Sequence, residues 1–213
     1  MDDQRRKSAS GEKPQLVTLR VDADQLSAFF ALLQRGVTMQ AVVGCSLQEL
    51  LCDQLGIPAD YVAGRITTIF LDNSPVDKLD ATIREGARIA LSAAMPGLVG
   101  AVLRRSGFYA ALRQGITHAE SSGALKAAGG TVRIKLFNLL LAEIGPLILA
   151  HGVLFQREEL DRLLGELSAS IRTKIASSCP SERDVLGQVL LAVTFQEKIG
   201  ALGEREWASC RLR

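Results

Sequence analysis

The sequence predicts an α+β protein, with a sheet and one packed helix in its first half and a mostly α-helical extension in its second. Three segments of the first half alternate apolar and polar residues, which is the spacing of half-buried strands, and a fourth is rich in β-branched and aromatic residues, which favour strands. Among them, residues 46–55 have the spacing and the capping residues of a helix. Beyond residue 138, apolar residues recur at helical spacing over long stretches.

The first strand is expected at "LVTLRV", residues 16–21, because its alternate residues are apolar. The following "DADQLSAFFALLQRG" predicts a helix that Asp22 caps and Gly36 ends. A second alternating run, "VTMQAVV" (residues 37–43), predicts the second strand. These elements open the predicted sheet.

The segment "CSLQELLCDQLGIP" predicts the best-defined helix of the chain. Ser46 and Glu49 form a capping box, in which each side chain satisfies a backbone N–H at the helix start. Gly56 supplies a left-handed residue at the other end, and Pro58 prevents continuation. The intervening leucines share one face, so we expect this helix to lie across the sheet.

Two further strands are expected in "RITTIFLD" (residues 65–72) and "IREGARIALSA" (residues 83–93). The order of elements divides the chain into a disordered tail at residues 1–14, a sheet domain at residues 15–104 and a mostly helical domain at residues 105–213.

The start of the second half fits two structures. In "TVRIKLFN" (residues 131–138) alternate residues are apolar, which favours a strand and a short hairpin over residues 115–138. A helix beginning near Thr131 is the alternative. Beyond it, "LLLAEIGPLILAHG" predicts a helix that is weakened or kinked at Gly145–Pro146.

The last third is expected to be helical. Residues 156–178 hold one apolar stripe for several turns. A final helix is expected to begin at Ser181, with Val185, Val189 and Val193 on one face. No internal repeat is apparent in the sequence.

Three motifs in residues 16–101 are similar to those of a known fold. "CSLQELLCDQLGI" matches a capped helix that follows a first hairpin, and "TIFLDNSPVD" matches a strand and its turn. "REGARIALSAAMPGLVGA" matches a last strand and a glycine-containing tail. With these motifs the segment resembles the β-grasp, ubiquitin-like fold, and within it the small sulfur carriers of molybdopterin and thiamine synthesis. The resemblance implies a β-grasp sheet that engages other proteins.

The chemistry of those carriers needs a flexible tail that ends in a free diglycine carboxylate. Here Gly97 and Gly100 are separated by two bulky residues and the chain continues, so that the carrier activity is not expected at this position. Gly129 and Gly130 are the only adjacent glycines, and cleavage after Gly130 would expose a diglycine. A carrier-derived protein activated by such cleavage is therefore an alternative function.

Two groups of residues are candidate sites. Met95, Pro96, Leu98 and Val99 form an apolar stretch suited to contacts with a protein partner. A second group lies in and just after "LRRSGFYAALRQG", where arginines stand beside aromatic residues and could bind an anion. Its members are Arg104, Arg105, Tyr109 and His118.

These groups lead to three functions. The preferred one is a non-catalytic binding or adaptor protein that engages a protein partner or a second copy of itself. The others are the carrier-derived protein and a small enzyme whose site lies between the two halves, around Arg105, Tyr109 and His118. No catalytic residue is assigned, because no motif of known geometry surrounds His118.

Composition narrows the classes of ligand. A net charge of +2 with few aromatic residues does not favour nucleic acid. The four cysteines form no CxxC pair, so we expect no metal site, no cofactor and free thiols in a reducing cytoplasm. The apolar stretches are short or interrupted, and no membrane span is expected.

Overall fold

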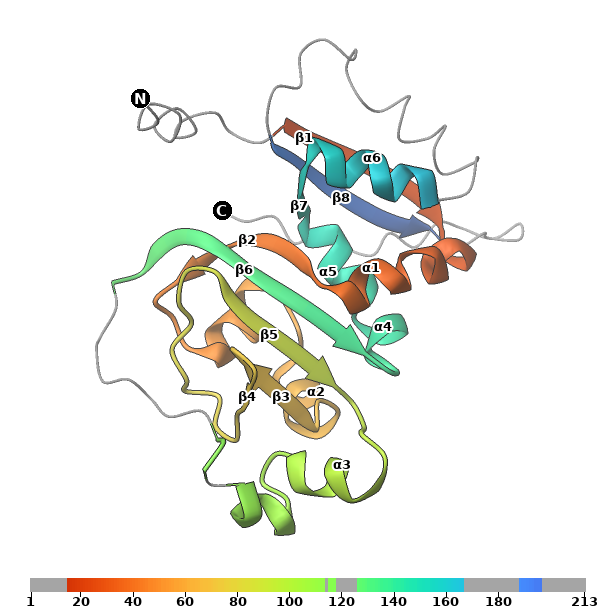
Figure 1. Ribbon diagram of the computed structural model, residues 1–213. Coiled ribbons are helices and arrows are strands. Elements are labelled where there is room, and N and C mark those ends of the chain that lie inside the picture. Colours follow the sequence, from red (N-terminus) through yellow and green to blue (C-terminus); the bar gives the residue numbers. More distant parts are fainter. Residues whose placement is uncertain (1–14, 114, 118–125, 167–187, 197–213) are drawn as a thin grey trace, which may run out of the picture.

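The fold is an eight-stranded mixed sheet with helices packed around it (Figure 1). The computed structural model describes residues 15–113, 115–117, 126–166 and 188–196, so that the tail expected at residues 1–14 lies outside the described residues. The strands are β1 (Gln15–Asp22), β2 (Val37–Val43), β3 (Thr68–Leu71), β4 (Ser74–Pro75), β5 (Ala87–Ser92), β6 (Ala128–Phe137), β7 (Val153–Gln156) and β8 (Gln188–Gln196).

The strands are arranged in the order β1-β8-β7-β2-β6-β5-β3-β4. Two pairs are parallel, β1 with β8 and β5 with β6, and the other neighbours are antiparallel. The sheet therefore has two parts, the three strands β1-β8-β7 and the five strands β2-β6-β5-β3-β4. They meet at the β2–β7 pair, which is held by one residue pair, Thr38 with Leu154.

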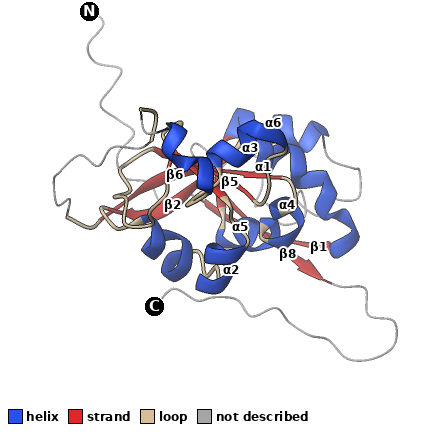
Figure 2. Ribbon diagram, turned by 90° about the horizontal axis from the view of Figure 1, so that it is seen from below, coloured by secondary structure: helices blue, strands red, loops and turns tan. Residues whose placement is uncertain are grey.

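The helices connect the strands and pack around them (Figure 2). Most are short, of six or seven residues. They are η1 (Ala23–Phe29), α1 (Phe30–Arg35), η2 (Glu49–Gln54), α2 (Ala59–Gly64), α3 (Gly97–Leu103), η3 (Phe108–Arg113), α4 (Leu140–Glu143), α5 (Gly145–His151) and α6 (Arg157–Glu166). None of the helices in the described residues is long and apolar enough to cross a membrane.

Two parts of the chain follow the same path, although no repeat is apparent in the sequence. In each part, a strand is followed by helical turns, a glycine and a second strand that runs in the same direction as the first. The first part leads from β1 to β2 through Gly36, and the second from β6 to β7 through Gly152. The two glycines have nearly the same backbone angles, φ 98° and ψ 137° against φ 107° and ψ 132°. Thr38 and Leu154, each two residues past its glycine, pair with one another.

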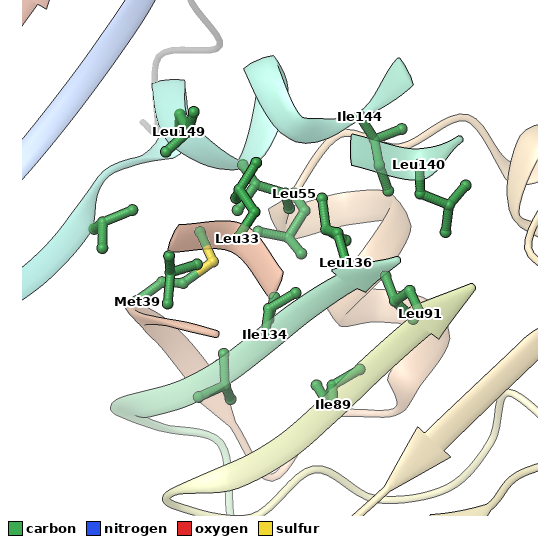
Figure 3. Packing of buried hydrophobic residues seen from close by; sticks show 14 of the residues in the cluster. Leu33, Met39, Leu55, Ile89, Leu91, Ile134, Leu136, Leu140, Ile144 and Leu149 are labelled. Carbon is green, nitrogen blue, oxygen red and sulfur yellow. The ribbon is translucent and has the colours of Figure 1, made fainter. Parts of the chain in front are cut away.

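The core lies on the inward side of the strands. Inward residues such as Met39, Ile134 and Ile89 are buried in one cluster with leucines of η2, α4 and α5, as Figure 3 shows for Leu55 and Leu140. The residues between them in sequence point the other way and are partly or fully exposed, which is the alternation expected of a sheet with one buried face. Burial of this face is the main stabilising contribution.

Several local predictions are confirmed. Ser46 and Glu49 form the capping box, with the Ser46 N–H donating to Glu49 Oε2 (2.7 Å) and the Glu49 N–H to Ser46 Oγ (3.2 Å). The helix that they cap continues as a π-helix over Glu49–Gln54. The predicted break at Gly145 separates α4 from α5. Between the two alternatives for residues 131–138, the strand is correct.

Other predictions need correction. The final helix expected across Val185, Val189 and Val193 is the strand β8 over Gln188–Gln196, in which Val189 and Val193 share one buried side with Leu191. A spacing of four residues places these valines on one face of a helix, but it equally places them on one side of a strand. Residue 185 lies outside the described residues, as do residues 167–178 of the preceding predicted helix.

Strands from both of the expected domains belong to one sheet. β1 does not form a hairpin with β2 but pairs with β8. The hairpin expected at residues 115–138 contributes one described strand, β6, which pairs with β2 and β5 instead. The described part of residues 105–213 thus supplies β6, β7 and β8 to one common sheet rather than a mostly helical extension. These pairings are long-range and leave no local pattern.

Replacing Gly152 with alanine tests the turn that enters β7. Gly152 has φ 107°, a conformation nearly restricted to glycine, and a Cβ there would lie 3.0 Å from Leu190 Cδ1. We expect Gly152→Ala to lower the free energy of unfolding by about 1–3 kcal/mol, measured by urea denaturation. Gly64→Ala is the control, because a Cβ at Gly64 meets nothing within 4 Å; an equal loss in both variants would contradict this account of Gly152.

Candidate functional site

The connection from β5 to β6 carries an exposed apolar surface. It contains α3 and η3, which lie at the lower end of the molecule, away from β1 and β8 (Figure 1). Six large apolar or aromatic side chains on this connection are exposed, and together they are called here the α3–η3 surface: Leu98, Val99, Phe108, Tyr109, Leu112 and Ile116. Phe108 is 92% exposed and Leu112 73%.

The sequence explains why α3 begins and packs as it does. Pro96 precedes the helix in an extended conformation, and Gly97 follows with φ 73°. Gly100 is buried where the helix passes over Met95, and a Cβ at Gly100 would lie 1.7 Å from the Met95 carbonyl oxygen. The glycine noted in the carrier-like tail is therefore needed for close packing of the backbone.

Arg113, at the end of η3, fixes the connection from within. Its side chain is 1% exposed, and Nη2 lies 2.5 Å from Asp77 Oδ1. Nε donates to the Val102 carbonyl oxygen (2.8 Å), and the Ser106 N–H donates to the same Asp77 oxygen (3.0 Å). A buried charge that is paired and hydrogen-bonded in this way holds its neighbours in place, because removal of one partner leaves the other uncompensated.

Arg105 attaches the same segment to the helical layer. Its backbone N–H donates to the Thr67 carbonyl oxygen (2.7 Å), and its Nη2 donates to the Val62 carbonyl oxygen (3.0 Å). Burial lowers the pKa of the Arg105 guanidinium, which nearby Asp77 partly opposes. Arg105 and Arg113 thus direct their polar groups inward, and the apolar residues of the connection face outward.

Two of the four predicted partner-binding residues, Leu98 and Val99, belong to this surface, and the other two, Met95 and Pro96, directly precede α3. Leu98 and Val99 are 72% and 63% exposed, Pro96 is exposed, and Met95 is partly buried. Sequence reasoning did not include the other residues of the surface in this group. The spacing of Phe108, Leu112 and Ile116, four residues apart, was the pattern that could have identified them.

Three of the four residues of the predicted anion-binding group, Arg104, Arg105 and Tyr109, are among the described residues. Arg105 is engaged with backbone carbonyls, and Arg104 is exposed beside it. Tyr109 packs edge-on against Phe108, with 5.1 Å between ring centroids, and so belongs to the apolar surface. His118 lies outside the described residues. Within the described residues, Arg105 connects this segment to Val62 of α2, and its role in anion binding stays a prediction.

A second polar cluster joins α2 to α4. Glu143 accepts hydrogen bonds from the Tyr61 hydroxyl (2.5 Å) and from Arg65 Nε (2.9 Å), and it forms an ion pair with Arg65 Nη2. These hydrogen bonds lower the pKa of Glu143 to about 2, and the bond from Arg65 has the largest effect. Burial and the neighbouring carboxylate raise the pKa of Tyr61. A carboxylate held ionised and a phenol held neutral make a structural clamp rather than an acid–base pair.

The remaining reactive side chains do not form a catalytic group in the described residues. Burial raises the pKa of the Cys45 and Cys52 thiols, so that neither is an activated nucleophile. Burial lowers the pKa of His151, at the end of α5, so that its imidazole is neutral at pH 7. The described residues contain no group of three His, Cys, Asp or Glu side chains placed to hold a metal ion.

Comparison of the chain with protein-family models, with curated proteins and with solved structures gave no match. The α3–η3 surface is the candidate site that the described residues present.

The pH dependence of stability tests the Glu143 cluster. The pKa of Glu143 is about 2 in the folded protein and has a reference value of 4.5, so that the cluster stabilises fully above pH 4.5 and loses its effect as pH falls towards 2. We expect Glu143→Gln to lower stability at pH 7 and to match the wild type near pH 2, measured by urea denaturation across that range. Asp80→Asn, in an exposed loop, is the control; a difference between Glu143→Gln and the wild type that is independent of pH would contradict the assignment.

Proposed function

We propose that this protein is a non-catalytic β-grasp module that binds a protein partner through the α3–η3 surface. The observation that carries the proposal is the outward presentation of apolar side chains by a segment whose arginines point inward. Exposed apolar side chains gathered on one segment are typical of interaction sites, because leaving them in water is unfavourable. The internal bonds of Arg113 and Arg105 support a preformed surface, which lowers the entropy cost of binding.

The β-grasp assignment is supported by the arrangement of β2-β6-β5-β3 around η2. This part is a mixed sheet with the parallel pair β5–β6 at its centre, and η2 connects β2 to β3 in the chain. Leu55, at the end of η2, packs on the inward side with Ile134 (Figure 3). In this proposal the central strand β6 follows the rest of the grasp in sequence instead of preceding it.

The charge of the segment indicates the kind of partner. Residues 95–117 contain three arginines and no aspartate or glutamate. Asp77 pairs with Arg113, and Arg104 remains exposed beside the apolar residues. A second copy would bring like charges together, whereas a different protein with an apolar groove rimmed by carboxylates would complement both features. We therefore propose a hetero-partner of that chemistry.

The carrier-derived alternative is less well supported by the geometry. Gly129 and Gly130 lie within β6 and are paired with Val42 and Ala41 of β2. A Cβ at Gly130 would lie 2.0 Å from Glu85 Oε2, so that a larger residue would displace a carboxylate that accepts hydrogen bonds from the Thr131 N–H and hydroxyl. Cleavage after Gly130 would require the first residues of β6 to separate from β2.

Substitutions on the α3–η3 surface test the proposed function. Phe108→Ser and Leu112→Ser remove exposed apolar side chains without changing charge. We expect each to weaken binding of the partner by about 30-fold, the effect of losing a hot-spot residue. The partner is captured from the native host with the wild type, identified by mass spectrometry and purified, and its affinity for each variant is measured by calorimetry.

Leu139→Ser is the matched control, because Leu139 is also an exposed leucine (54%) and lies outside the surface. It should leave the affinity unchanged. Equal binding by all variants would overturn the proposal. Concentration-dependent dimerisation that Phe108→Ser abolishes would assign the surface to self-association, and vesicle binding that it abolishes would assign it to lipid; both would contradict the hetero-partner.

A further inference from the structure

Building on the proposed function of the α3–η3 surface, we propose that Asp77 is its positioning residue. In this proposal Asp77 attaches residues 95–117, which contain α3 and η3, to the sheet as a unit that opens separately from the core. Asp77 is not part of the α3–η3 surface and is distant from it in sequence. It controls how much of the protein presents the surface to the partner.

Residues 95–117 contribute no side chain to the hydrophobic core. Among the described residues of this segment only Gly100 and Arg113 are buried, and the core cluster passes from Ala93 to Val132 without a member between them. Elements that lack core contacts open at a lower free energy than the protein as a whole, because opening them exposes little apolar surface. We therefore expect residues 95–117 to open and close as a local unit.

Four hydrogen bonds attach this segment to the rest of the described structure. Two come from the N–H and the guanidinium of Arg105, which donate to backbone carbonyl oxygens. The other two end on one atom, Asp77 Oδ1, which accepts from the Ser106 N–H (3.0 Å) and from Arg113 Nη2 (2.5 Å). Half of the attachment thus depends on a single carboxylate oxygen.

Asp77 is anchored to the sheet by its neighbour. It follows the buried Val76, whose N–H donates to the Ile69 carbonyl oxygen of β3 (2.9 Å). The Asp77 side chain is 30% exposed, whereas that of its partner Arg113 is 1% exposed. A guanidinium buried to this degree needs a carboxylate partner, because an uncompensated buried charge is costly. Loss of the Asp77 charge should therefore favour the open segment, in which Arg113 is exposed to water.

Arg113 also joins the parts of the segment to one another. Its Nε donates to the Val102 carbonyl oxygen in α3 (2.8 Å), and its Nη1 donates to Thr117 Oγ1 (3.3 Å). The Thr117 hydroxyl donates in turn to the Arg113 carbonyl oxygen (3.0 Å). One guanidinium thus connects α3, η3 and the residues that follow η3, so that they attach and detach together.

The turn between α3 and η3 adds to the requirement for Asp77. Ser106 in this turn has φ 53°, a left-handed conformation that is uncommon for residues other than glycine. The Ser106 N–H donates to Asp77 Oδ1 in this conformation. Removing the carboxylate removes one of the bonds that hold Ser106 at this angle, so that the turn relaxes.

The attachment has a kinetic consequence for partner binding. A ligand that binds one of two states has its apparent affinity lowered by the fraction of protein in that state. A substitution of Asp77 should therefore slow association and leave dissociation unchanged. The loss of a contact residue such as Phe108 should instead speed dissociation, as most interface substitutions do.

Hydrogen exchange of the free chain, followed by NMR, tests the attachment without a partner. The amides of Arg104, Ala110 and Thr117 donate within the segment. In the wild type we expect them to exchange by a common opening at a lower free energy than the amides of β6. In Asp77→Asn they should exchange about 10-fold faster, the loss of a charge-assisted hydrogen bond, while β6 is unchanged.

Asp80→Asn is the matched control, because Asp80 is an exposed acid three residues further along the chain. It should leave exchange in the segment unchanged. Exchange of the segment at the free energy of β6 in the wild type would overturn the proposal, and this measurement needs no variant to fold. Equal acceleration in the segment and in β6 of Asp77→Asn, or no acceleration in either, would overturn it as well.

Binding kinetics with the purified partner, measured by surface plasmon resonance, test the positioning role. Asp77→Asn should lower the association rate constant by about 10-fold at an unchanged dissociation rate constant. An unchanged association rate constant would contradict the role of Asp77. Faster exchange in Asp77→Asn, combined with equal partner binding by Phe108→Ser and the wild type, would refute the proposed function of the surface and support the attachment.

Discussion

The structure depends on the pairing of β6 between β2 and β5. β6 is ten residues long, pairs with seven residues of β2 on one side and six of β5 on the other, and buries Val132, Ile134 and Leu136 in the core. Without it, β2 and β5 would have no common neighbour, and the sheet order would be interrupted at its centre. This strand joins residues of the second half to a sheet that the first half begins.

The same pairing positions the proposed binding surface. Parallel neighbours cannot be joined by a tight turn, so the chain must cross from the end of β5 to the start of β6 by a long connection. α3 and η3 lie in that connection, and the ion pair of buried Arg113 with the partly exposed Asp77 fixes them against the body of the protein. The parallel pairing of β5 and β6 thus requires an exposed connecting segment, and this ion pair orders it.

Local features were predictable from sequence, whereas long-range ones were not. The capping residues Ser46 and Glu49 and the helix break at Gly145 depend on neighbouring residues, and both predictions are confirmed. The pairing of β1 with β8 joins residues that are far apart in sequence, and no local pattern encodes it. For the site, Leu98 and Val99 could be named from sequence, but the engagement of Arg105 by the Val62 carbonyl oxygen depends on tertiary packing.

Hydrogen exchange of the full chain, followed by NMR, tests the central role of β6 most directly. We expect the protected amides of β6 and β5 to exchange with the same free energy, equal to that of global unfolding, because neither strand can open without disrupting the common core. Amides of β6 that exchange by a local opening well below the global free energy, while those of β5 stay protected, would contradict this account. That result would mean that the first half of the chain holds its sheet together without β6.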